Sequence, residues 1–184
     1  MVPLLIVLGI VALVVIVFTA LYNGLVRLRN RVEGAWSQID VQLQGRHDLV
    51  PNLVETVKGY ASHERETLEA VVEARNVAVA AQGPQQQAQA ENVLTGALRQ
   101  LFALAEAYPD LKANQNFLAL QEELTSTEDR VAYARQFYND AVLGYNTKIQ
   151  SIPSNVIAGM FNFTVREFYE ADDDETRDVP RVQF

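Results

Sequence analysis

An uncharged, strongly apolar run at the N-terminus constrains the fold of this chain more than any other feature. The run begins at Val2 and ends at Tyr22. As an α-helix rising about 1.5 Å per residue it is about 32 Å long, which matches a hydrocarbon core about 30 Å thick. We therefore expect residues 1–24 to form a transmembrane anchor, with the lipid bilayer as its partner.

The run fits an uncleaved span better than a signal peptide or a buried helix. A cleaved secretory signal has a basic residue before its apolar core and a small-x-small cleavage site. No Lys or Arg precedes this run, and bulky Phe18 occupies the wrong place in the nearest candidate site, Phe18-Thr19-Ala20. A helix buried in a soluble core is also disfavoured, because a helix that is apolar all round has no face for water.

Basic residues after the run predict its orientation. Arg27, Arg29 and Arg31 form a candidate membrane-interface cluster, and no basic side chain lies before the run. Since Lys and Arg near a span favour the cytoplasmic side, we predict that the N-terminus lies outside and the C-terminal domain in the cytoplasm. The alternative is that these arginines only solvate the next helix and carry no topological information.

Composition excludes several kinds of chemistry. Asp and Glu number 23 against 15 Lys and Arg, and this acidic balance argues against nucleic acid as a partner. The chain has no Cys and only two histidines, His47 and His63. It lacks a phosphate-binding loop, a nucleophile elbow, a His-Glu-x-x-His pair, a dinucleotide fingerprint and the Glu-x-x-His motif of di-metal bundles. We therefore predict no enzymatic activity, no cofactor and no metal site.

Helical periodicity continues beyond the anchor. No proline occurs between Leu4 and His47, so the anchor and the first helix of the domain are expected to form one rod. Pro51 is expected to end that rod and to begin a second helix, which Gly83-Pro84 ends. The Gln- and Ala-rich residues 85–90 are interpreted as the solvated beginning of a third helix.

A heptad repeat marks the fourth helix and completes the predicted fold. Its positions are Phe117, Leu124, Val131, Tyr138 and Tyr145, which is typical of a bundle or coiled-coil seam. The fold class is therefore all-α: the transmembrane helix continues into an elongated antiparallel four-helix bundle over residues 25–150. A short apolar capping helix over residues 151–163 and an acidic tail over residues 164–184 follow.

The capping helix has an alternative reading. Its apolar side chains could cover the end of the bundle, a partner or the membrane interface. Interfacial helices normally carry Lys or Arg on their polar face, and none lies between Ser151 and Phe163. A bundle cap is therefore preferred.

Several motifs distributed along the chain resemble those of the LemA family of bacterial membrane-anchored proteins. They are YNGLVRLRNRVEGAWSQIDVQL at 22–43, RHDLVPNLVETVKGYA at 46–61, ETLEAV at 66–71, YARQFYND at 133–140, FNF at 161–163 and REFY at 166–169. The resemblance covers essentially the full chain. It implies a single N-terminal membrane helix, in the bacterial cell membrane, that carries a long helical bundle, in a family whose biochemical activity is poorly defined.

The residue types in these motifs favour side-chain packing and polar pairing over a catalytic centre. Trp36 is interpreted as a core anchor in preference to a ligand-stacking platform. Polar residues around Pro51 and on the fourth helix form a candidate interaction layer: Arg46, Asp48, Asn52, Glu55, Tyr133, Arg135, Tyr138, Asn139 and Asp140.

Two functions fit these features. The first is a membrane-anchored scaffold that self-associates and binds unidentified membrane or cytoplasmic proteins. The second is a sensory or ligand-binding module that relays a signal through the anchor helix, for which the polar layer is the motivation.

Overall fold

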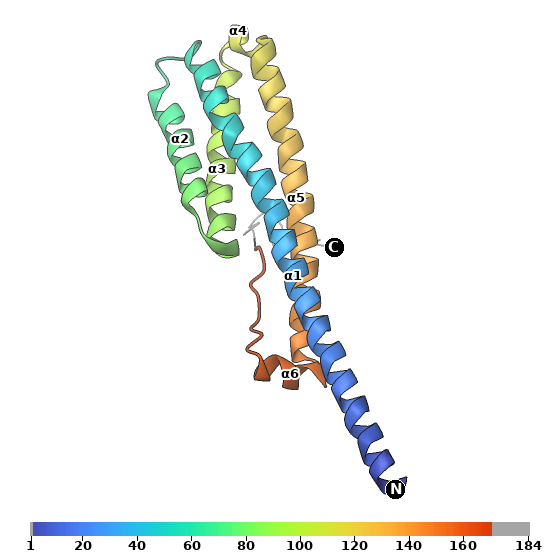
Figure 1. Cartoon of the computed structure of the whole chain (residues 1–184). Helices are drawn as coiled ribbons and strands as arrows, with labels where there is room; N and C mark the ends of the chain where they lie inside the picture. Colours follow the sequence, from blue (N-terminus) through green and yellow to red (C-terminus); the bar gives the residue numbers. More distant parts are fainter. Residues whose placement is uncertain (1, 171–184) are drawn as a thin grey trace, which may run out of the picture. The chain divides into compact units, whose positions relative to one another are not determined.

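The computed structural model describes residues 2–170, and within them every regular element is a helix (Figure 1). The helices are α1 (Val2–Lys58), α2 (Arg65–Ala80), α3 (Gly83–Ala105), α4 (Pro109–Lys112), α5 (Gln115–Gln150) and α6 (Ser154–Met160). The prediction of an all-α fold is confirmed for this part of the chain. Most of the predicted acidic tail, including its run of acidic residues at 172–175, lies outside the described residues.

Helix α1 is one unbroken helix from Val2 to Lys58. The expectation that the anchor and the next helix form one rod is thus confirmed, but the expected break at Pro51 is wrong. Proline lacks the N–H that would bind the carbonyl four residues earlier, which here belongs to His47. Arg75 on α2 supplies the missing donor, since its Nε lies 3.2 Å from the His47 carbonyl oxygen.

The chain turns eight residues after Pro51, between α1 and α2. Tyr60 and Ala61 both donate their backbone N–H to the carbonyl of Val57, at 2.9 and 2.8 Å. Val57 and Ala61 are fully buried, so apolar packing holds this turn in place. The second helix therefore begins at Arg65, and residues 52–58 belong to the first.

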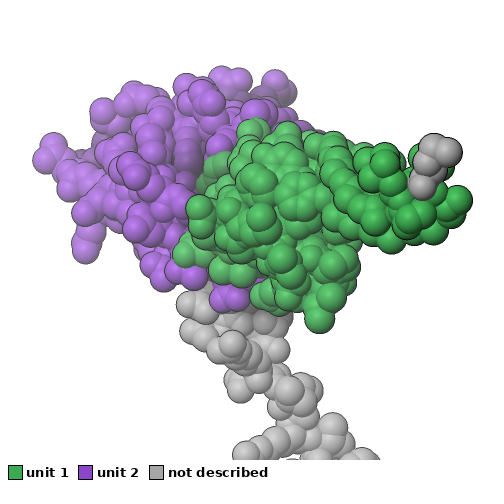
Figure 2. Space-filling view, turned by 60° about the horizontal axis from the view of Figure 1, so that its bottom comes forward, with its two compact units in different colours: residues 1–39, 134–167 green, residues 40–133, 168–184 purple. Residues whose placement is uncertain are grey.

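Two compact units make up the structure (Figure 2). Unit 1 contains residues 2–39 and 134–167, and unit 2 contains residues 40–133 and 168–170 of the described chain.

The core of unit 2 is formed by apolar side chains from five helices. Figure 1 shows α2 and α3 side by side within this unit. Each fully buried Leu or Val contributes about 1.5–3 kcal/mol relative to an exposed side chain. The buried residues are Val50, Leu53, Val54 and Val57 of α1, Leu68, Val71, Ala74 and Ala78 of α2, Ala90, Leu94, Leu98, Leu101 and Ala105 of α3, Leu111 of α4, and Phe117 and Leu124 of α5.

The beginning of α3 is solvated only in part: Gln85, Gln86 and Gln89 are exposed, as the sequence predicts, but the residues between and after them are not. Residues 85–90 are helical, but Gln87, Ala88 and Ala90 are buried, and so is Glu91 just after them. A Gln- and Ala-rich stretch looks polar only when its composition is averaged. At helical spacing its small alanines face the core, and Gln87 finds polar partners there.

Unit 1 pairs the first part of α1 with the second part of α5. Leu25, Val32, Ala35 and Ile39 are buried on α1, and Tyr138, Ala141, Val142, Tyr145 and Ile149 are buried on α5. Trp36 is half-buried, and its ring meets that of Tyr138 edge-on with centroids 5.4 Å apart. The predicted heptad positions from Phe117 to Tyr145 are all buried.

The N-terminal part of α1 is exposed along its whole circumference. All described residues from 2 to 17 are exposed, although nearly all of them are apolar. Among the described residues, α1 is the one helix long and apolar enough to cross a membrane.

Candidate functional site

A buried cluster of polar side chains lies in unit 2, where α1 meets α3. We call it the Glu91 cluster; its members are Arg46, His47, Gln87, Glu91 and Thr95. Gln87, Glu91 and Thr95 are four residues apart along α3 and therefore lie on one face of that helix. Arg46 and His47 are adjacent on α1, and both are buried.

The carboxylate of Glu91 is the centre of the cluster. Its Oε2 lies 2.9 Å from Nη1 of Arg46. Its Oε1 accepts hydrogen bonds from Nε2 of His47 at 2.6 Å and from Nε2 of Gln87 at 3.1 Å. Because a carboxylate only accepts hydrogen bonds, Nε2 of His47 carries the proton in this contact.

The cluster is closed by bonds to neighbouring groups. Nη2 of Arg46 donates to the hydroxyl of Thr95 at 2.9 Å, and Nε2 of Gln87 also donates to the backbone carbonyl of Ala78 at 3.1 Å. These bonds compensate much of the buried charge, which lowers the cost of burying it, while Nε of Arg46 is buried without a hydrogen-bond partner. The cluster links α1, α2 and α3 by directional contacts as well as by apolar packing.

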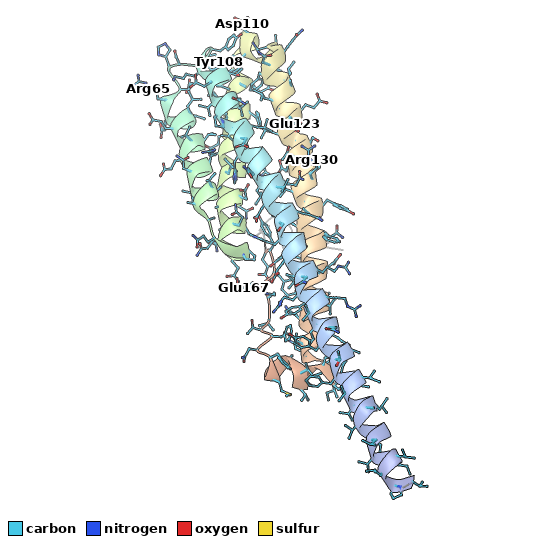
Figure 3. All side chains as sticks on the ribbon, viewed as in Figure 1. Arg65, Tyr108, Asp110, Glu123, Arg130 and Glu167 are labelled. Carbon is cyan, nitrogen blue, oxygen red and sulfur yellow. The ribbon has the colours of Figure 1, made fainter. Side chains whose placement is uncertain are left out.

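Other ion pairs of this unit are on the surface. Arg130 and Glu123, both on α5, are joined by a 2.7 Å contact, with about half of each side chain exposed (Figure 3). Tyr108 donates to Glu64 at 3.0 Å, and this hydrogen bond raises the pKa of the Tyr108 phenol. The exposed pair of Arg130 and Glu123 contributes little to stability, and Tyr108 and Glu64 are only partly buried, so the Glu91 cluster stands apart by its burial.

A surface cavity of about 420 Å³ adjoins the cluster. His47 and Gln87 belong to both, and the cavity wall also contains two carboxylates and one guanidinium, those of Asp40, Asp48 and Arg75. Partial burial raises the pKa of Asp40. The wall therefore offers both charge signs next to apolar side chains, which suits a small polar or zwitterionic group.

The nine residues of the predicted polar layer are distributed over both units. Arg46, Asp48, Asn52, Glu55 and Tyr133 belong to unit 2, and Arg135, Tyr138, Asn139 and Asp140 belong to unit 1. In unit 2 only Arg46 joins the buried cluster. Asp48 is exposed at the cavity, Asn52 is exposed on α1, Glu55 pairs with Lys58 at 3.6 Å, and Tyr133 is 75% exposed.

In unit 1 the fourth-helix residues have different surroundings. The buried Tyr138 donates its hydroxyl to the backbone carbonyl of Glu167 at 2.9 Å, and burial raises its pKa. Arg135 and Asn139 are partly buried, and Asp140 is exposed. The predicted interface arginines are on α1: Arg29 lies 5.4 Å from the ring centre of Phe163, Arg31 lies 5.5 Å from that of Phe137, and Arg27 is exposed.

Sequence reasoning missed most of the Glu91 cluster. The predicted polar layer includes Arg46 but not His47, Gln87, Glu91, Thr95 or Arg75. The sequence of α3 does contain a signal. Its polar residues Gln87, Glu91 and Thr95 recur every four positions, next to apolar residues at Ala88, Ala90, Leu94 and Leu98. A polar stripe on the apolar side of a helix indicates buried pairing.

The fold and the site define a class: an all-helical protein with one exposed apolar helix of membrane-spanning length and a buried ion-pair cluster in its helical core. The sequence model of the LemA family matches residues 35–184. The chain belongs to the LemA family, as its motifs predicted.

Similar proteins support this assignment. The chain is 27% identical to Protein LemA of Metamycoplasma hominis, over 89% of this chain and 75% of that protein. It is 25% identical to Magnetosome protein MamQ 2 of Paramagnetospirillum magneticum, over 90% and 71% of the two chains. It is 24% identical to Magnetosome protein MamQ of Magnetospirillum gryphiswaldense, over 91% and 72%. Family membership and the apolar helix together indicate a single-pass, membrane-associated protein.

Proposed function

We propose that this chain is a membrane-anchored scaffold that self-associates, binds other proteins at the membrane surface and catalyses no reaction. In this proposal residues 1–24 are the anchor, residues 25–150 form an antiparallel four-helix bundle, and residues 151–163 and 164–184 form a short apolar helix and an acidic tail. The bundle is supported by the core of unit 2, which draws its buried residues chiefly from α1, α2, α3 and α5.

The observation that carries the proposal is the continuity of α1. A single helix contains the exposed apolar stretch and also the residues Val50, Leu53 and Val57 of the unit 2 core. A flexible linker would let a domain move freely from its anchor, whereas here the same helix that contains the span continues into the core of the domain. Such a construction suits a protein whose task is to hold partners at a membrane.

The Glu91 cluster supports a structural role in preference to catalysis. Both oxygens of the Glu91 carboxylate and two nitrogens of Arg46 are engaged by neighbouring side chains. A catalytic acid or base needs access to the proton of a substrate, and these groups are turned toward one another within the core. The names of the similar proteins refer to LemA and to the magnetosome, and none refers to a reaction.

For self-association we propose the outer face of α2 and the adjoining groove between α1 and α2. Val72 and Val79 are seven residues apart, share one face of α2 and are exposed. The groove has a volume of about 690 Å³, and its apolar lining comes from Val54, Leu68 and Val72. A second copy of the same helix face fits this surface, because two such stripes pack by interlocking ridges and grooves.

Light scattering of the detergent-purified full-length chain tests the scaffold. We expect a dimer or larger oligomer whose population rises with concentration, and a shift toward monomer in Val72→Asp/Val79→Asp. The matched control is Leu118→Asp, an exposed apolar position on α5 of the same unit, which should leave the oligomer intact. A chain that stays monomeric at all concentrations would contradict self-association.

We further propose that the domain faces the cytoplasm, on the support of Arg27, Arg29 and Arg31 directly after the span. If this orientation is right, a reporter enzyme that works only in the cytoplasm should be active when it is fused after Phe184. Activity of a reporter that works only outside the membrane would overturn this orientation.

A sensory or ligand-binding role is the second candidate, and the cavity beside His47 favours it. Its wall combines Asp40 and Asp48 with Arg75, so a small polar ligand could contact the Glu91 cluster through His47. A panel of amino acids, amines, phosphates and divalent metals in a thermal-shift assay tests it. Stabilisation that is lost in Arg75→Ala supports the role, and no shift with any compound contradicts it.

A further inference from the structure

The C-terminal part of unit 1 carries exposed apolar side chains that neither the scaffold nor the Glu91 cluster uses. From Ile149 to Val165 the chain has no charged residue. Within this stretch α6 buries Ser154, Ile157 and Ala158 on one side. On the other side of α6 Val156 and Met160 are 62% and 64% exposed, and Ile152, just before the helix, is 85% exposed; we call these three residues the exposed stripe.

Direct contacts place this segment beside the end of the membrane span. The ring of Phe161 lies 5.9 Å from that of Phe18 and 4.8 Å from that of Tyr22. Phe163, two residues on, lies 6.0 Å from Tyr22 and also contacts Arg29. Figure 1 shows α6 turned across the end of α5 next to α1, with the N-terminal part of α1 extending beyond it.

Polar contacts fix the position of the segment along α1. Asn146 on α5 donates to the backbone carbonyl of Arg166 and accepts from its N–H, both at 2.9 Å. The guanidinium of Arg166 then reaches Glu33 on α1 at 3.3 Å. The chain after α6 therefore runs along α1 away from the span, and α6 is left at the level of Phe18.

Phe18 lies close to the expected end of the membrane span. A hydrocarbon core about 30 Å thick accommodates about 20 helical residues, so a span that begins at Val2 ends near Tyr22. Phe18 is one turn earlier, about 6 Å along the axis. Phe18, Tyr22, Phe161 and Phe163 thus form an aromatic group near the end of the span, and Tyr22 is of a residue type that is enriched at membrane interfaces.

We propose that α6 is an interfacial helix whose exposed stripe inserts into the bilayer surface next to the anchor. The occupant of this apolar face is lipid, because Phe161, which directly follows Met160, contacts Phe18 and Tyr22 at the end of the exposed apolar part of α1. The lack of Lys and Arg is no obstacle here: the span already holds α6 at the bilayer, so its insertion is intramolecular and needs no electrostatic attraction to the membrane. The proposal rests on membrane insertion of α1 and is independent of self-association.

Site-specific fluorescence in lipid vesicles tests the proposal with the full-length chain. The natural sequence has no Cys, so Val156→Cys and Met160→Cys each give a single site for an environment-sensitive dye. The vesicles contain phosphatidylcholine with or without bromine atoms in the acyl chains. The matched control is Leu143→Cys, an exposed apolar position of α5 in the same unit, about 10 Å of helical rise before the end of that helix.

We expect dyes at positions 156 and 160 to emit at shorter wavelength than a dye at position 143. They should lose about half of their emission in brominated vesicles, since interfacial helices sit about 5–10 Å below the headgroup boundary. The dye at position 143 should keep its emission in brominated vesicles and be quenched by aqueous iodide.

Three results would overturn the proposal. Dyes at 156 and 160 that emit as in water and respond to iodide would show the stripe exposed to solvent. A short emission wavelength without quenching by bromine would show that protein covers it. Equal quenching by bromine at 143 would show that depth does not distinguish α6 from α5. Reconstituted chain that resists carbonate extraction confirms insertion of α1 in each case, so failure of the anchor is recognised separately.

Discussion

At the scale of single residues, Glu91 determines how charge is accommodated in the core of unit 2. Its carboxylate and the guanidinium of Arg46 are about 95% buried and 2.9 Å apart. Removing one partner of such a pair leaves an uncompensated buried charge, whereas replacing both by apolar residues avoids that penalty. The free energy of unfolding should therefore fall more when one partner is removed than when both are replaced.

We expect Glu91→Leu to lower the free energy of unfolding by about 3–5 kcal/mol, because it leaves Arg46 unpaired. Arg46→Met/Glu91→Leu should recover part of this loss, because Arg46 is no longer left as an unpaired charge while His47 and Gln87 still lose their acceptor. Chemical denaturation of the full-length chain in detergent measures both. As a control, Glu123→Gln removes a half-exposed pair and should change the value by less than about 1 kcal/mol. A double variant less stable than either single variant would contradict the assignment.

Tyr145 should make stability sensitive to alkaline pH. The ring is 1% exposed, and burial raises the pKa of its phenol above the ordinary value of about 10. Since the unfolded chain ionises first, the stabilising contribution of Tyr145 is complete below pH 10 and is lost as the pH rises from there toward the folded pKa. The free energy of unfolding should therefore fall above pH 10.

We expect Tyr145→Phe to flatten this alkaline fall, measured as the difference between unfolding free energies at pH 9 and pH 11. Tyr133→Phe is the control, because the ring of Tyr133 is 75% exposed and its removal should leave the wild-type slope. An unchanged slope in Tyr145→Phe would show that the fall has another origin.

At the scale of elements, the long helices could be predicted from the sequence, but the short helix α4 and the end of α1 could not. Periodicity identified α3, α5, the stop at Gly83 and the continuity of α1 with the anchor. The predicted break at Pro51 was wrong because it rested on a local rule, that proline lacks a backbone donor. The sequence does not reveal that Arg75, from another helix, supplies a donor to the free carbonyl. The Glu91 cluster was not predicted for the same reason, because Arg46 and His47 are more than forty residues from Glu91 in the sequence.

We expect the effects of Pro51 and Arg75 to be coupled. Pro51→Ala restores an N–H that can bond to His47, which should raise the free energy of unfolding by about 1–3 kcal/mol. In that background the bond from Arg75 is redundant. Arg75→Ala should cost about 1 kcal/mol in the natural chain and clearly less beside Ala at position 51.

A double-mutant cycle in denaturant measures this coupling. Arg99→Ala, which removes an exposed arginine of α3, is the control and should have the same small effect in both backgrounds. If Arg75→Ala costs equally much with and without Pro51, the guanidinium does not act through the freed carbonyl.

At the scale of the whole molecule, α1 takes part both in membrane insertion and in the folding of the helical core. Its residues 2–17 are exposed and apolar, while its residues 43–57 include much of the unit 2 core. Sequence reasoning could predict the span because bilayer thickness sets its length independently of the rest of the chain. It could not predict where α6 lies, since that depends on contacts between residues more than a hundred positions apart, such as Phe18 and Phe161.

The membrane attachment of the whole chain should depend on the centre of this apolar stretch. An arginine at the middle of a span costs about 2.5–3.5 kcal/mol, so Val11→Arg/Val14→Arg should move the chain from the carbonate-resistant membrane fraction to the soluble fraction. Val93→Arg/Leu118→Arg adds the same charge at exposed positions of unit 2 and should stay with the membrane. Retention of the doubly charged span variant would mean that another part of the molecule, with α6 the first to examine, holds it there.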